Sequence, residues 1–271
     1  MKRFLTVALA MSSLSLCAAE FHPFDGPKPI AALIQTDPWA MVMGADTPRV
    51  AAYEDGTVIF LKRSKDGASY HCRKLSEAEL SDFKQHLMPV VGLKHWKNFY
   101  SLRPNVTDQP EARFYVRDGV RELVTGVYGL TATVTKLPAY TVFSGGDKPD
   151  RVPDELLELH RYLCSVDYPD SKEWSPKYVE VMIWPYEYAP DASIIWPKDW
   201  PALDSERSLK RGSSYSIFLD GSALPELRKF LQTRKDKGAV EIGGKKWAVS
   251  VREVFPSEPV WRKAFQGAKE K

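Results

Sequence analysis

The stretch VAAYEDGTVIFLKRSKDGASYHCRKL, residues 50–75, decides the fold, because two Asp-Gly pairs separate three runs of β-branched and aromatic residues. Asp55-Gly56 and Asp66-Gly67 are strong short-range signals for tight turns between antiparallel strands. The pattern predicts a three-stranded antiparallel meander, with strands near residues 50–53, 57–63 and 69–75.

A helix is predicted directly after this meander. Ser76 and Glu79 have the spacing of a capping box, in which each residue satisfies a free backbone N–H of the other. Phe83 and Leu87 then fall on one helical face. Pro89 is expected to end the helix, because proline removes a backbone donor and crowds the preceding turn.

The rest of the chain alternates between similar signals for strands, turns and helices. The predicted elements are a hairpin over 112–128, a short strand near 140–143, a helix opening at Pro153, strands over 178–184 and 214–219, a helix over 222–236 and a hairpin over 239–255. The lysine-rich end of the chain is expected to fray.

Together these elements predict an α+β fold of mainly antiparallel sheets with about three covering helices. Residues 69–128 and 214–255 share the order β-α-β-β, so two related units are one hypothesis. We divide the chain into residues 1–19, an N-terminal α+β unit over 20–146 and a C-terminal α+β unit over 147–271. The two units can equally form one continuous domain.

The first 19 residues have the pattern of a secretory signal peptide. Lys2 and Arg3 precede a moderately apolar run that ends in the small residues Ala18 and Ala19. We predict cleavage after Ala19 and a periplasmic or secreted protein, with a lipoprotein modified at Cys17 as the alternative. No later stretch is long and apolar enough for a membrane helix.

The charge of the chain argues against nucleic acid as a partner. The formal net charge is +3, and residues 1–19 carry two positive and no negative charges, so the processed chain has +1. Nucleic-acid-binding domains usually have a clear basic excess.

Two cysteines remain after processing, Cys72 and Cys164. In an oxidising compartment they form either one long-range disulfide or two free thiols, and the sequence leaves both alternatives open.

The sequence contains no short motif of a catalytic, nucleotide-binding or metal-binding site, so no catalytic residue, metal or cofactor is predicted. His71, Cys72, His160 and Cys164 are zinc-ligand types. However, neighbouring residues on a strand point to opposite faces, which makes His71 and Cys72 poor joint ligands.

The most unusual run is WPYEYAPDASIIWPKDWP, residues 184–201, which contains three Trp-Pro pairs. Each proline biases the preceding tryptophan towards an extended conformation, so the run is expected to be stiff and non-helical. Large aromatic side chains more often pack in a core than face a ligand, and packing is the expected main role. The candidate ligand-binding residues are Trp184, Tyr186, Tyr188, Trp196, Trp200 and Trp247.

The signal peptide, the hairpin opening AAYEDGTVIF, the helix start LSEAEL, the Trp-Pro run and the terminal EIGGKKWAVSVREVFP together resemble exported bacterial proteins of uncharacterised function. The resemblance implies export and this architecture, and no activity, cofactor or catalytic residue.

Three hypotheses for function follow. The first is a non-enzymatic binding protein of the periplasm or cell envelope, whose partner is an envelope protein or a glycan. The second is an extracytoplasmic hydrolase whose site is assembled from dispersed residues, and the third is an architectural envelope component.

Overall fold

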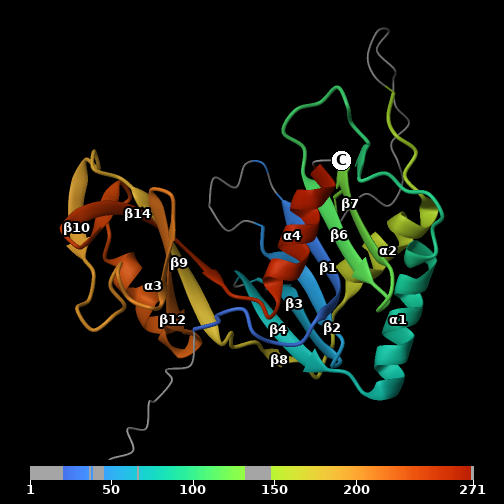
Figure 1. Ribbon diagram of the computed structural model, residues 1–271, viewed down its shortest axis with the longest axis horizontal. Helices are drawn as coiled ribbons and strands as arrows, with labels where there is room; N and C mark the ends of the chain where they lie inside the picture. The colour runs from blue at the N-terminus through green and yellow to red at the C-terminus, as the bar shows by residue number, and fades with distance from the viewer. Residues whose placement is uncertain (1–20, 37, 39–45, 66, 132–147, 270–271) are drawn as a thin grey trace, which may run out of the picture.

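The computed structural model describes residues 21–36, 38, 46–65, 67–131 and 148–269. These residues form an α+β fold with two mixed, mostly antiparallel sheets, one of eight strands and one of six, and four α-helices. Figure 1 shows the two sheets side by side, with the six-stranded sheet at the left. The predicted signal peptide and the expected strand near 140–143 lie outside the described residues.

The eight-stranded sheet has the order β5-β7-β6-β1-β2-β3-β4-β8, in which every neighbouring pair is antiparallel except β5 and β7. Its strands are β1 (Pro29–Thr36), β2 (Pro48–Tyr53), β3 (Thr57–Ser64), β4 (Gly67–Lys74), β5 (Phe99–Ser101), β6 (Glu111–Arg117), β7 (Glu122–Tyr128) and β8 (Lys172–Glu173). The predicted meander is confirmed as β2, β3 and β4, and the predicted hairpin over 112–128 as β6 and β7. Gly56 has a φ of 86°, the left-handed conformation that its tight turn requires.

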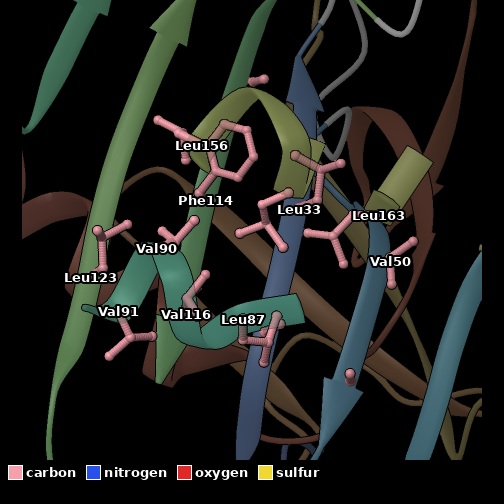
Figure 2. Packing of buried hydrophobic residues seen from close by; sticks show 14 of the residues in the cluster. Leu33, Val50, Leu87, Val90, Val91, Phe114, Val116, Leu123, Leu156 and Leu163 are labelled. Carbon is pink, nitrogen blue, oxygen red and sulfur yellow. The ribbon is translucent and has the colours of Figure 1, made fainter. Parts of the chain in front are cut away.

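One face of this sheet is covered by α1 (Glu77–Val91) and α2 (Asp154–Ser165). Figure 2 shows Leu33 and Phe114 from the strands packed against Leu87 of α1 and Leu156 of α2. The predicted capping box is confirmed, since the Ser76 hydroxyl accepts from the backbone N–H of Glu79. The expected end at Pro89 is wrong, because α1 continues to Val91 with Pro89 inside it.

The opposite face is covered by the last helix, α4 (Glu258–Lys269), which packs against β1, β6 and β7 (Figure 1). Trp261 of α4 is fully buried, and Phe265 is 9% exposed. Both side chains pack with Tyr53, Tyr115 and Phe255. The prediction that the lysine-rich end frays is therefore wrong for residues 258–269, because two aromatic residues four positions apart bury one face of a helix.

The six-stranded sheet has the order β10-β13-β14-β9-β12-β11, with only β10 and β13 parallel. Its strands are β9 (Tyr178–Pro185), β10 (Asp191–Ile195), β11 (Ser208–Arg211), β12 (Ser214–Asp220), β13 (Gly238–Ile242) and β14 (Lys245–Glu253). A short 3-10 helix, η1 (Gly221–Ala223), leads into α3 (Leu224–Gln232). Leu227, Phe230 and Leu231 of α3 pack on one face of this sheet.

Some elements that follow residue 147 pack on the eight-stranded sheet rather than on the six-stranded one. Although α2 and β8 follow that position, α2 packs in the core of the eight-stranded sheet and β8 pairs with β4. After β14 the chain returns, and α4 packs on the same sheet. At the other end of the chain, Phe21 and Phe24 stack on Phe218 of the six-stranded sheet before β1 begins.

The strand orders do not support two related β-α-β-β units. In the first unit, three strands lie between β4 and its hairpin, whereas in the second unit only β9 lies between β12 and its hairpin. The hairpin strand that lies nearer to the unit's first strand also differs. In the first unit it is β6, the first strand of its hairpin, and in the second unit it is β14, the second strand of its hairpin.

Candidate functional site

Three of the six predicted ligand-binding aromatics belong to the core of the six-stranded sheet. Trp196, Trp200 and Trp247 are 6%, 9% and 4% exposed. The rings of Trp196 and Trp200 are 4.8 Å apart, and Phe230 of α3 stacks on Trp200 at 5.4 Å. The indole N–H of Trp247 donates to the carbonyl of Ile242 at 3.1 Å, and that of Trp196 is likewise bonded to a backbone carbonyl. These three side chains support the sheet.

The other three predicted aromatics do not join them in one surface. Tyr188 is 82% exposed, and Tyr186 and Trp184 are half-buried. Tyr186 and Tyr188 stack edge to face at 5.0 Å. Trp184 follows Ile183, whose side chain is in the core, so Trp184 lies on the face of the sheet opposite Trp247.

The disulfide between Cys72 and Cys164 is not formed, and both residues are free thiols. Cys72 packs on the face of the eight-stranded sheet that α4 covers, whereas Cys164 packs on the face that α1 and α2 cover. Bridging them would require the side chains to pass through the sheet.

Cys164 also has a histidine partner, because its Sγ lies 3.5 Å from Nε2 of His160. Burial raises the pKa of the Cys164 thiol. Burial and the nearby charge of Arg49 lower the pKa of His160 to about 4. Both groups therefore stay neutral near pH 7, which is the opposite of the thiolate and imidazolium pair that a nucleophilic cysteine needs. Within the described ranges, no three His, Cys, Asp or Glu side chains are grouped to hold a metal ion.

A hollow that combines exposed aromatic and polar side chains lies beside α4. It consists of two cavities of about 580 and about 490 Å³ that share the lining residues Asn98, Val124 and Ala268. We call these two cavities the α4 groove. One wall is α4, and the floor and the other wall come from β6, β7, β5 and the residues just before β5.

Small residues on α4 create the space. Trp261 and Phe265 pack in the core, and Phe265 also borders the smaller cavity, whereas the small residues Ala264, Gly267 and Ala268 line the larger one. Gly126 of β7 has the same effect on the floor, since a Cβ atom there would lie 2.6 Å from Glu111 Oε1 and 3.3 Å from Phe99 Cδ2.

Two aromatic side chains stand in the groove with much of their surface open to solvent. Trp96 is 40% exposed and lines the larger cavity, and Phe99 is 48% exposed and lines the smaller one. The larger cavity also contacts Val260 of α4, which is 38% exposed. A folded chain that leaves two large aromatics partly uncovered beside a cavity has an apolar surface available for a ligand.

An ion pair forms the polar part of the floor. Nε of Arg113 donates to Oε1 of Glu111 at 2.8 Å, and the terminal nitrogen Nη2 donates to Oε2 at 3.2 Å. The two side chains are 22% and 19% exposed, so they are partly shielded from water and still reachable from the groove. Both residues line the smaller cavity together with Gly126.

Hydrogen bonds hold the segment that carries the exposed aromatics. The Thr125 hydroxyl donates to the Lys97 carbonyl at 2.8 Å, and the backbone N–H of Gly126 donates to the Asn98 carbonyl at 3.0 Å. The Asn98 amide nitrogen donates to the carbonyl of Ala268 at 3.3 Å, which joins this segment to α4. Lys97 pairs with Asp150, and this hydrogen bond raises the pKa of Lys97.

A buried ion-pair network fixes the start of α4. Arg252 of β14 bonds to Glu180 of β9 and donates to Glu258 of α4 at 2.7 Å, and Glu258 also pairs with Arg262. Arg252 is 4% exposed and the two carboxylates are 1% exposed. Although burial opposes its charge, the carboxylates of Glu258 and Glu180 raise the pKa of Arg252 above its usual value. The network thus connects the six-stranded sheet to the helix that walls the groove.

No family model, curated protein or solved structure matches this chain. The function must therefore be argued from the residues themselves. In the part of the chain that the structure describes, no helix is long and apolar enough to cross a membrane.

Among the described residues that line the two cavities there is no Ser, Cys or His. The Thr125 hydroxyl donates to a backbone carbonyl, and the Glu111 carboxylate is paired with Arg113. The other ionisable side chains of the lining are Glu122 and Lys263 of the larger cavity.

No sequence pattern predicts the groove, because its exposed aromatics come from a stretch without periodicity and one wall comes from the chain end that was expected to fray. The available signal was local. Trp96 and Phe99 stand in the polar segment KHWKNFYS, residues 94–101, without the periodic apolar partners that would bury them.

Proposed function

We propose that this chain is a non-enzymatic binding protein of the periplasm or cell envelope, and that its ligand, an envelope protein or a glycan, occupies the α4 groove. The observation that carries the proposal is the exposure of Trp96 and Phe99, 40% and 48%, in two adjoining cavities of about 580 and about 490 Å³. Cavities of this size are typical of ligand sites.

The exposed aromatic surface is large enough to account for useful affinity. A tryptophan side chain buries at most about 250 Å². Covering the exposed 40% of Trp96 would remove about 100 Å² from water, which is worth about 2.5 kcal/mol at about 25 cal/mol per Å². A ligand that covers Trp96 should therefore lose on the order of 50-fold in affinity when this side chain is removed.

The groove is a better candidate than the Trp-Pro run. The folded chain already buries Trp196, Trp200 and Trp247. These side chains therefore have little surface area left for a ligand. Tyr188 is exposed, but it stands on a turn next to Tyr186. It therefore serves as a control for the effect of removing an exposed aromatic.

The test uses the purified chain without residues 1–19, immobilised and exposed to both an envelope extract and a glycan array. Trp96→Ala and Phe99→Ala are compared with the wild type and with the control Tyr188→Ala. We expect a ligand that the wild type and Tyr188→Ala retain, and that both groove variants lose. Retention that is unaffected by both groove substitutions, or no retention by the wild type in either arm, would contradict the proposal.

A further inference from the structure

We propose that the ligand of the α4 groove is a neutral oligosaccharide, with a sugar ring stacked on Trp96 and sugar hydroxyl groups bonded to the Glu111–Arg113 pair. This inference rests on the proposed function, because it names the ligand class of the same site.

The charges in the groove favour a ligand without net charge. The charged residues that line the two cavities are two acids, Glu111 and Glu122, and two bases, Arg113 and Lys263. Glu111 and Arg113 already neutralise each other through two hydrogen bonds. An anionic or cationic ligand would have to break this pair or accept a like charge nearby, whereas a neutral polar ligand faces neither cost.

The ion pair suits hydroxyl groups in particular. A carboxylate only accepts hydrogen bonds and a guanidinium only donates them, so the pair presents acceptors and donors side by side. A hydroxyl both donates and accepts, and two neighbouring hydroxyls of a sugar can bond to both members of the pair. Hydrogen bonds to ionised groups are stronger than those between neutral groups.

The aromatic side chains suit the remaining surface of a sugar ring. One face of many sugar rings carries mainly C–H groups, which are apolar and slightly positive. The face of an aromatic ring is apolar and carries negative charge density, so the two surfaces are complementary. Trp96 and Phe99 offer such surfaces in cavities that Asn98, one of the two residues between them in sequence, also lines.

A protein partner fits the groove less well. Stable protein interfaces bury about 800 Å² on each partner around an apolar centre that is depleted of charge. In the described part of the chain, the large apolar side chains that are exposed in the groove are Trp96, Phe99 and Val260. They are divided between the two cavities, which four charged residues also line.

Gly126 provides the sharpest variant for a test. A methyl group at this position would lie 2.6 Å from Glu111 Oε1. Gly126→Ala therefore forces the Glu111 carboxylate to move from its position beside Arg113 and adds volume to the floor of the smaller cavity. Arg113→Met removes the donor half of the same pair without adding volume to the floor.

The experiment is a glycan array of neutral and anionic oligosaccharides, with a peptide library as a separate arm and tryptophan fluorescence titration of each hit. We expect at least about tenfold preference for neutral oligosaccharides, and affinity that changes less than about twofold between low and high salt. Trp96→Ala, Gly126→Ala and Arg113→Met should each weaken binding at least about tenfold, while Tyr188→Ala leaves it unchanged. Thermal melting of each variant verifies that the chain is folded.

The outcomes separate the two proposals. A peptide ligand, or a charged oligosaccharide, whose binding depends on Trp96 would overturn the ligand class and leave the groove as the binding site. If no ligand in any arm depends on Trp96 or Phe99, the ligand class and the proposed function fail together.

Discussion

Replacing Arg252 by methionine should destabilise the protein strongly, because Arg252 is the link between two buried carboxylates. Its side chain is 4% exposed, and it pairs with Glu180 and Glu258, each 1% exposed. Methionine has a similar length and no charge, so the substitution removes the pairing without opening a large cavity.

The magnitude follows from the partners that remain. Removing one member of a buried ion pair costs about 3–5 kcal/mol, because the other member is left charged and unpaired. Glu180 keeps Arg211 and Glu258 keeps Arg262. The loss should therefore be about 3–5 kcal/mol rather than twice that amount, which lowers the melting temperature by about 6–20 °C for a chain of this size.

The assay is urea unfolding at neutral pH, with Arg228→Met as the matched control. Arg228 pairs with Glu253 but is 63% exposed, so its substitution should cost less than about 1 kcal/mol. The triple variant Arg252→Met, Glu180→Gln, Glu258→Gln removes the buried charges together and should recover more than half of the loss.

A loss below about 1 kcal/mol in Arg252→Met would refute this reasoning, since it would place the pairs in water rather than in the interior. A triple variant that is less stable than the single variant would show that packing, and not unpaired charge, causes the loss.

Three further predictions concern other parts of the molecule. The pKa of His160 is lowered from 6.5 to about 4, so its contribution to stability is present above pH 6.5 and is lost as pH falls towards 4. Between pH 7.5 and 5 this residue alone should reduce the free energy of unfolding by about 2 kcal/mol, and His160→Gln should flatten that part of the pH profile; an unchanged profile would contradict the buried neutral ring. Trp200→Ala should cost about 3–5 kcal/mol because Trp200 is 9% exposed, whereas Tyr188→Ala, at a side chain that is 82% exposed, should cost at most about 0.5 kcal/mol; equal losses in thermal unfolding would show that the Trp-Pro run does not pack as described. Cys72 and Cys164 are free thiols in the structure, so alkylation of the unfolded, unreduced chain without residues 1–19 should label both in mass spectrometry, and an unlabelled pair would establish a disulfide instead.

Local chemistry explains which elements were predictable. The strands β2, β3 and β4 follow from Asp55-Gly56 and Gly67, and the start of α1 follows from Ser76 and Glu79, because the cause and its effect lie within a few residues. The end of α1 was not predictable in this way. Tertiary packing that buries Val90 and Val91 outweighs the backbone bond that Pro89 removes.

The candidate site depended on contacts that no local pattern contains. Trp96 precedes β5 and Phe99 is its first residue, whereas the opposite wall comes from α4, about 160 residues later in the chain. Similarly, Glu180, Arg252 and Glu258 are ordinary charged residues in sequence, and they become a buried network only where β9, β14 and α4 meet.

By itself, the sequence determined the α+β class, most of the strands and the capped start of α1, because turn chemistry and side-chain alternation act over a few residues. The tertiary structure decided the rest. It placed Trp196, Trp200 and Trp247 in a core, separated Cys72 from Cys164 by the thickness of a sheet, and returned α4 to the first sheet. The physical reason is that burial depends on which distant segments meet, and a residue's own neighbours in sequence do not encode that.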